Sequence, residues 1–135
     1  MSEHPPGFSV GGDMLDITLP IDLTNGNDGR SKSWYKPAIE RKFFEALLIA
    51  KYRRQTPLDY PVRLVVTRIL GPKQRLWDYS SILRGSWKEL EDAMVACGFF
   101  HDDGPKWITS VVGDQDDSQR ENGPSVRVEA FRSQE

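Results

Sequence analysis

Three acidic residues and one lysine near the middle of the chain have types that could bind a divalent metal and a phosphate. Asp78 precedes a segment of helical periodicity that carries Lys88, and the adjacent pair Asp102 and Asp103 follows that segment. Carboxylates are the hard oxygen ligands that Mg²⁺ prefers, and a lysine can stabilise charge on a phosphate. Spacing alone favours a simpler interpretation, because Asp-Asp-Gly-Pro is also an ordinary solvated turn.

The segment between these acids is predicted to be an amphipathic helix from Ser86 to Cys97, ended by Gly98. Its start stays open, because Ser86 with Glu89 fits a capping box while Ser80 or Ser81 could cap an earlier turn. The buried face is predicted from apolar residues at three- and four-residue intervals: Ile82, Leu83, Trp87, Leu90, Met94 and Cys97. The residues between them face out or toward a site: Lys88, Glu89, Glu91 and Asp92.

This segment resembles the core signature of the RusA-like family of Holliday-junction resolvases. In that signature, D-x-D-N leads into a helix with lysine and Asp-Ala-hydrophobic, then Gly, aromatics and Asp-Asp. The matching residues here are Asp78, Lys88, Asp92-Ala93-Met94, Gly98-Phe99-Phe100 and Asp102-Asp103. Ser80 and Ser81 stand where the family usually has the second Asp and the Asn, and Lys88 lies farther from Asp78, as if Arg84-Gly85 marked an insertion.

The resemblance extends more weakly over residues 14 to 132. Asp16 to Pro20, followed by Asn25 and Asn27, is similar to the family's opening strand and turn. Pro61 to Val66 and Val126 to Val128 are similar to its later strands.

The resemblance implies catalytic residues Asp78, Lys88, Asp102 and Asp103, and a homodimer acting on branched DNA. Mg²⁺, or Mn²⁺, would be bound by the three acids, with Ser80 as a degraded or water-mediated ligand position. A helix of this length rises about 18 Å. Asp78 therefore meets Asp103 only if the chain returns directly, or if the site lies close to a subunit boundary, where a twofold dimer would offer two sites to a four-way junction.

The charge is distributed unevenly along a chain whose net charge is only −2. Residues 1–29 hold five acids and no Lys or Arg, residues 30–88 hold fourteen Lys or Arg against four acids, and residues 89–135 hold four against eleven. The basic middle supplies cations for phosphate contacts, although solvated helix ends would explain part of it equally well. The predicted DNA contacts are Arg30, Lys32, Lys36, Arg68, Lys73, Arg75 and Arg84.

The element pattern predicts one α+β domain over residues 14–132, with a mixed sheet, two main helices packed on it and a disordered tail at 1–13. Strands are expected at 15–19, 62–70, 106–112 and 125–131, with a flexible polar connection at 113–124. A helix is expected to begin at Pro37. Its buried stripe is predicted as Ile39, Phe43, Ala46, Leu47 and Ala50.

Three functions stay open on these residues. The first is a metal-dependent endonuclease that resolves four-way junctions in recombination or repair, and the second is a junction-binding protein weakened or inactivated by Ser80. The third is a small interaction domain whose acidic motif is a turn. The lone Cys97 and the lack of a long apolar run or signal-like N-terminus favour a cytoplasmic protein without a membrane span.

Overall fold

A four-stranded mixed sheet is the framework of the domain. The computed structural model describes residues 14–23 and 36–133, apart from the side chains of Met14 and Ser80. The predicted tail at 1–13 and the predicted DNA contacts Arg30 and Lys32 lie outside this range, as do Asn25 and Asn27. The predicted α+β domain with a mixed sheet is confirmed for the described residues.

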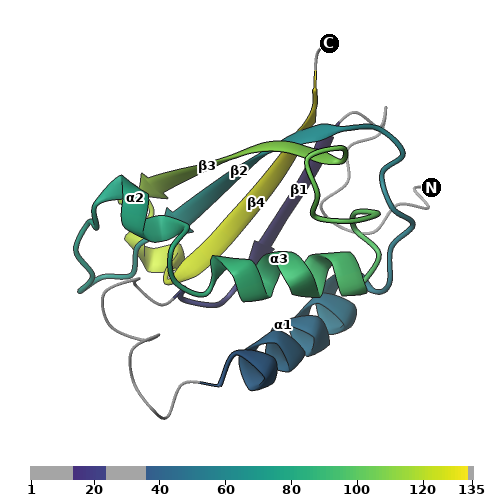
Figure 1. Ribbon diagram of the computed structural model, residues 1–135. Helices are drawn as coiled ribbons and strands as arrows, with labels where there is room; N and C mark the ends of the chain where they lie inside the picture. Colours follow the sequence, from purple (N-terminus) through teal and green to yellow (C-terminus); the bar gives the residue numbers. More distant parts are fainter. Residues whose placement is uncertain (1–13, 24–35, 134–135) are drawn as a thin grey trace, which may run out of the picture.

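The sheet has the order β1-β4-β2-β3 (Figure 1). β4 runs antiparallel to both of its neighbours, while β2 and β3 are parallel. The strand bounds are β1 Met14–Leu19, β2 Val62–Ile69, β3 Ile108–Asp116 and β4 Ser125–Arg132. The four predicted strands are therefore present.

The predicted end of β3 was wrong. The strand continues through Asp116, so Gly113 to Asp116 pair with Val66 to Ile69 rather than forming a flexible connection. These residues are polar because β3 is the last strand of the sheet and one of its faces is open to solvent. A 3₁₀ turn, η2 Arg120–Asn122, then leads into β4.

Both long helices lie on one face of the sheet, α1 (Pro37–Tyr52) and α3 (Trp87–Ala96) (Figure 1). This arrangement explains why apolar and polar residues alternate along β1. Leu15, Ile17 and Leu19 are buried beneath the helices. Asp16 and Thr18 face the other side of the sheet. Within the described ranges, no helix is long and apolar enough to cross a bilayer.

The predicted start of α1 at Pro37 is confirmed, but its predicted buried stripe was wrong. Phe44, Leu48 and Tyr52 form the buried face, whereas Ile39 and Phe43 are 67% and 56% exposed. Both sets have helical spacing, so the periodicity could not separate them. A tertiary contact does: the Tyr52 hydroxyl accepts from the Thr18 N–H (2.9 Å) and donates to its C=O (3.1 Å), which covers the free edge of β1.

Helix α3 ends as predicted at Gly98. The Gly98 N–H donates to the Val95 C=O (3.0 Å) and the Phe99 N–H donates to the Met94 C=O (2.9 Å), the paired bonds of a Schellman motif. Gly98 has φ +90°, and a Cβ there would overlap the carbonyl oxygen of Gln55. The motif turns the chain back so that Phe99 and Phe100 enter the core and Asp102 follows them.

Of the two starts that the sequence left open, the one at Ser86 is confirmed, whereas Ser80 and Ser81 cap no helix, because both lie inside a separate short helix whose N-cap is Asp78. A short helix, α2 Tyr79–Ile82, begins directly after Asp78, and α3 begins after Ser86. Ser86 is the N-cap residue, although its side chain makes no capping hydrogen bond. The turn between the two helices contains Arg84 and Gly85, where the sequence indicated an insertion.

Candidate active site around Lys88 and Asp78

Lys88 is the centre of a cluster of carboxylates, here called the Lys88 cluster: Lys88, Glu91, Asp92 and Asp103. The Lys88 ammonium contacts the Asp103 carboxylate directly and lies 3.2 Å from Asp92 Oδ1 and 3.7 Å from Glu91 Oε1. Glu91 and Asp92 are three and four residues after Lys88 on α3, so they share its face. Asp103 comes from the loop after the Schellman turn. The structure thus brings together two predicted site residues, Lys88 and Asp103.

The electrostatics of this cluster follow from its contacts. The hydrogen bond with Asp103 raises the pKa of Lys88 above its ordinary value, and the same bond lowers the pKa of Asp103. Burial is the main reason that the pKa of Glu91 is raised, with Lys88 acting in the opposite direction. At neutral pH Lys88 is therefore protonated and positively charged. Glu91 is the carboxylate beside it whose charged form is disfavoured by burial.

The loop that carries the acidic pair is a hydrogen-bonded turn. Asp102 Oδ1 accepts from the Asp103 N–H (2.8 Å), and the Gly104 carbonyl accepts from the N–H groups of Trp107 and Ile108 (both 3.0 Å). His101 packs against the Trp107 ring and lies 3.3 Å from Asp59 Oδ1. The Asp-Asp-Gly-Pro segment is thus a turn that also delivers Asp103 to Lys88.

Asp78 is the N-cap residue of α2, and its carboxylate is exposed. Its carbonyl oxygen accepts from the Ser81 N–H (2.9 Å). Among the described residues, no hydrogen bond or ion pair links its carboxylate to Lys88, Asp102 or Asp103. The side chain of Ser80, the predicted fourth ligand position, lies outside the described part of the chain.

The Lys88 cluster fits Mg²⁺ in donor chemistry, because Asp92 and Asp103 already share one cation through oxygen atoms. It does not supply a complete ligand set. Within residues 14–23 and 36–133, no group of three or more His, Cys, Asp or Glu side chains is placed to hold a metal ion.

The predicted DNA contacts within the described ranges divide into two groups. Lys36, Lys73, Arg75 and Arg84 are exposed, the first before α1 and the others around α2. Arg84 also donates to the Ser81 hydroxyl at 3.4 Å. Their exposure leaves them accessible to a phosphate backbone.

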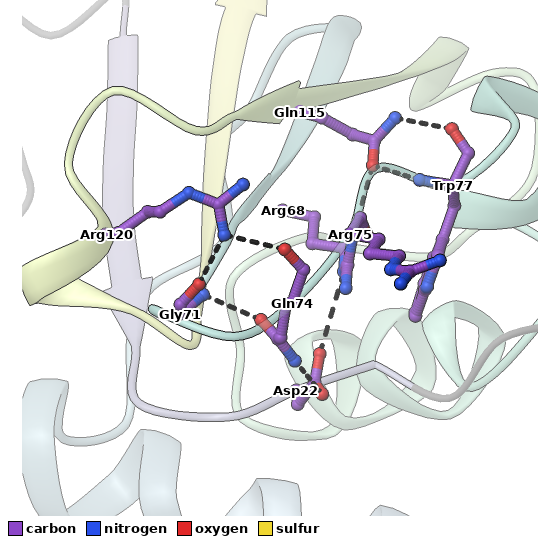
Figure 2. A network of polar contacts seen from close by, with 8 residues as sticks. All are labelled: Asp22, Arg68, Gly71, Gln74, Arg75, Trp77, Gln115 and Arg120. Atoms are coloured by element: carbon purple, nitrogen blue, oxygen red, sulfur yellow. Dashed lines mark hydrogen bonds and ion pairs between the residues drawn. The ribbon is translucent and has the colours of Figure 1, made fainter.

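Arg68 is a correction to the predicted DNA contacts. Its side chain is 2% exposed and lies within the polar network of Figure 2. Its Nη1 donates to the Arg75 carbonyl (2.9 Å) and to Gln115 Oε1 (3.1 Å), so this end of the guanidinium is bound inside the protein. The reason is register: Leu64, Val66 and Arg68 point to the helix-covered face of β2.

Three residues of the site and its surroundings were missed from the sequence. Glu91 was expected only to face out or toward a site, although its three-residue spacing from Lys88 indicates the contact. Buried Glu89 was likewise placed among these outward positions. Gln115 lay in the stretch interpreted as flexible, and no local pattern predicts its contact with Trp77 across the fold.

One hollow of the described structure lies away from these residues. It measures about 490 Å³ and lies on the open face of the sheet beside β1 and β4, where Asp16, Thr18, Lys51 and Arg127 line it. Arg127 forms two hydrogen bonds with the Asp16 carboxylate (2.6 and 2.8 Å), and Lys51 donates to the Thr18 carbonyl (2.5 Å). The cations of this hollow are therefore already paired.

No protein-family model matches this chain, and the search of curated proteins found no match either. The functional assignment therefore rests on the residues and contacts described above.

Proposed function

We propose that this protein is a structure-selective DNA endonuclease that cleaves four-way junctions. The observation that carries the proposal is the contact between Lys88 and Asp103, fifteen positions apart in the chain. The resemblance to RusA-like resolvases requires these two residues to share a site, whereas helical periodicity and turn chemistry alone do not require it.

The roles follow from the chemistry of each group. Asp78, Asp102 and Asp103 are the proposed oxygen ligands of Mg²⁺ or Mn²⁺, which when bound would activate water and reduce the negative charge at the scissile phosphate. Lys88 is aligned by Asp103 and Asp92 and supports charge that develops on the phosphate.

The charge of the site supports a requirement for a divalent cation. Four carboxyl groups, those of Glu91, Asp92, Asp102 and Asp103, surround or adjoin the single ammonium of Lys88. A phosphodiester approaching such a surface is repelled unless added positive charge compensates it. The exposed basic residues around α2 and before α1 would hold the DNA backbone by its shape and charge rather than by base sequence.

The proposed assembly is a cytoplasmic homodimer that presents two sites to a branched DNA substrate. A twofold axis relates the two sites, and a four-way junction has matching symmetry. Sedimentation of the protein alone would measure the number of subunits in the assembly, and sedimentation with a junction would measure the number of subunits bound to each junction.

Cleavage of a labelled four-way junction tests the function, with wild type and Asp103→Asn assayed in Mg²⁺, Mn²⁺ or chelator. We expect paired nicks that require metal and fall at least about 100-fold in Asp103→Asn. Junction binding should be retained or improved, because the substitution removes negative charge. Asp117→Asn, an exposed acid outside the cluster, is the matched control and should nick as wild type does.

A second candidate is a junction-binding protein without nuclease activity. It is favoured by Ser80 and Ser81 in place of Asp and Asn and by the incomplete ligand set among the described residues. Tight junction binding with no nicks in either metal would select it. Failure to bind branched or duplex DNA at low salt would reject both candidates and favour a small interaction domain.

A further inference from the structure

The main chain at Trp77 is held by the side chain of Gln115, which reaches across from β3 (Figure 2). Gln115 Oε1 accepts from the Trp77 N–H (2.8 Å), and Gln115 Nε2 donates to the Trp77 carbonyl oxygen (2.8 Å). One amide therefore satisfies both polar groups of a loop residue, as a neighbouring strand would. Trp77 immediately precedes Asp78.

Arg68 holds both members of this pair. It donates to Gln115 Oε1 (3.1 Å), and its guanidinium carbon lies 3.7 Å from the centre of the Trp77 ring. The Arg68 donation also fixes which end of the Gln115 amide is oxygen, and that orientation suits both bonds to Trp77. Arg68, Gln115 and Trp77 are here called the Trp77 clamp.

The clamp has further support below Arg68. Asp22 Oδ1 lies 3.8 Å from Arg68 Nε, and Asp22 Oδ2 accepts from Gln74 Nε2 (2.6 Å). Burial lowers the pKa of Arg68, and Asp22 opposes that shift. Replacing a buried ionic group with apolar residues is often neutral or stabilising, so a network of this kind need not be retained for stability alone.

The clamp acts on the peptide group that joins Trp77 to Asp78. Gln115 Nε2 holds the carbonyl of that peptide, and the Ser81 N–H holds the carbonyl of Asp78 itself. The peptide groups on both sides of Asp78 are thus hydrogen-bonded, while its carboxylate is exposed. These bonds therefore fix the main chain from which the Asp78 side chain extends, and among the described residues no hydrogen bond or ion pair holds its carboxylate.

We propose that Gln115 is the positioning residue of the Asp78 carboxylate, acting through the Trp77–Asp78 peptide, and that Arg68 fixes the Gln115 amide. The proposal rests on the proposed nuclease function, because it assigns Asp78 a task that requires accurate placement. Residues that orient a ligating group from outside the site commonly change activity by about 10- to 100-fold.

Gln115→Met and Gln115→Glu separate the parts of the clamp. Methionine has a similar length but keeps neither bond, whereas glutamate can still accept from the Trp77 N–H and from Arg68 but cannot donate to the Trp77–Asp78 peptide. Both variants should lower the kcat of junction nicking by at least about tenfold and change junction affinity by less than about twofold. Gln119→Met is the matched control, since Gln119 bonds to Asp116 instead.

Amide hydrogen exchange tests the clamp independently of cleavage. In Gln115→Met, the Trp77 amide should exchange roughly tenfold faster, while core amides of β2 keep their wild-type rates. Gln115→Glu keeps an acceptor for that amide and should leave its exchange near the wild-type rate; if the methionine variant does not fold, the kcat of Gln115→Glu tests the positioning role and faster exchange at its Trp77 amide would contradict the retained bond.

The outcomes distinguish the two proposals. Nicking by wild type together with wild-type kcat in folded Gln115→Met or Gln115→Glu overturns the positioning role and leaves the nuclease function standing. Unchanged exchange at Trp77 in folded Gln115→Met overturns the clamp itself. Absence of nicking by wild type overturns the nuclease function, and with it the catalytic role of the clamp, whatever the exchange rates show.

Discussion

Glu91 is the residue in the Lys88 cluster whose ionisation opposes folding. Its pKa is raised in the folded protein, chiefly by burial, so the folded state binds a proton more tightly than the unfolded state does. Its unfavourable contribution is therefore present at neutral pH and disappears as the pH falls through its folded pKa toward the ordinary value of 4.5.

We expect Glu91→Gln to increase the free energy of unfolding at pH 7 by about 0.5 to 1 kcal/mol, because it removes a partly desolvated charge. Urea denaturation from pH 7 to pH 4 measures the difference, which should shrink as the wild-type carboxyl is protonated. Glu121→Gln, at an exposed position, should change little at any pH. A destabilised Glu91→Gln would mean that its ion pair with Lys88 outweighs its burial.

Residues of the site were predictable where local spacing or a known signature constrained them. The signature paired Lys88 with Asp103, and both are found in one cluster. Arg68 was interpreted as a DNA contact because charge alone does not reveal the face of a strand on which a residue lies. Gln115 could not be predicted, since its contact with Trp77 joins residues 38 positions apart without any repeating pattern.

At the scale of elements, the sequence predicted which segments form strands and helices better than which faces they bury. Strands β1, β2 and β4 and both long helices occur where periodicity and turn residues placed them. The stripe of α1 was misplaced because two apolar stripes of helical spacing overlap, and packing against β1 selected the one ending at Tyr52. Ile39 and Phe43 are consequently exposed.

Gly98 is the element-scale position at which we expect the strongest single-residue effect. Gly98→Ala should lower the free energy of unfolding by at least about 2 kcal/mol, because it adds left-handed strain and a Cβ that overlaps the Gln55 carbonyl. Thermal and urea denaturation measure the loss. Gly104→Ala is the control, since a Cβ there meets only Asp102 Oδ2 at 3.5 Å; equal losses in the two variants would refute the Schellman explanation.

At the scale of the whole molecule, the uneven charge predicts how DNA binding should respond to salt. Lys73, in the basic middle of the chain, is exposed beside α2, whereas Lys106 is exposed in the acidic C-terminal part. If Lys73 contacts a phosphate, Lys73→Gln should weaken binding to junctions of any DNA sequence. It should also reduce the magnitude of the slope of log K against log salt concentration by about 1. Lys106→Gln should leave that slope unchanged, and equal slopes in all three proteins would place the DNA surface elsewhere.

The strand order also determines when the domain can fold during its synthesis. β4 lies between β1 and β2, and the Asp16–Arg127 pair that joins β1 to β4 spans 111 positions of the chain. Because a ribosome releases the N-terminal part first, β1 emerges long before its partner strand and remains without it until β4 follows. Pairing between such distant parts of a chain makes folding slow. Until β4 has been translated, the apolar strands β1 and β2 both lack this neighbour, and the nascent chain exposes them to chaperones and to aggregation.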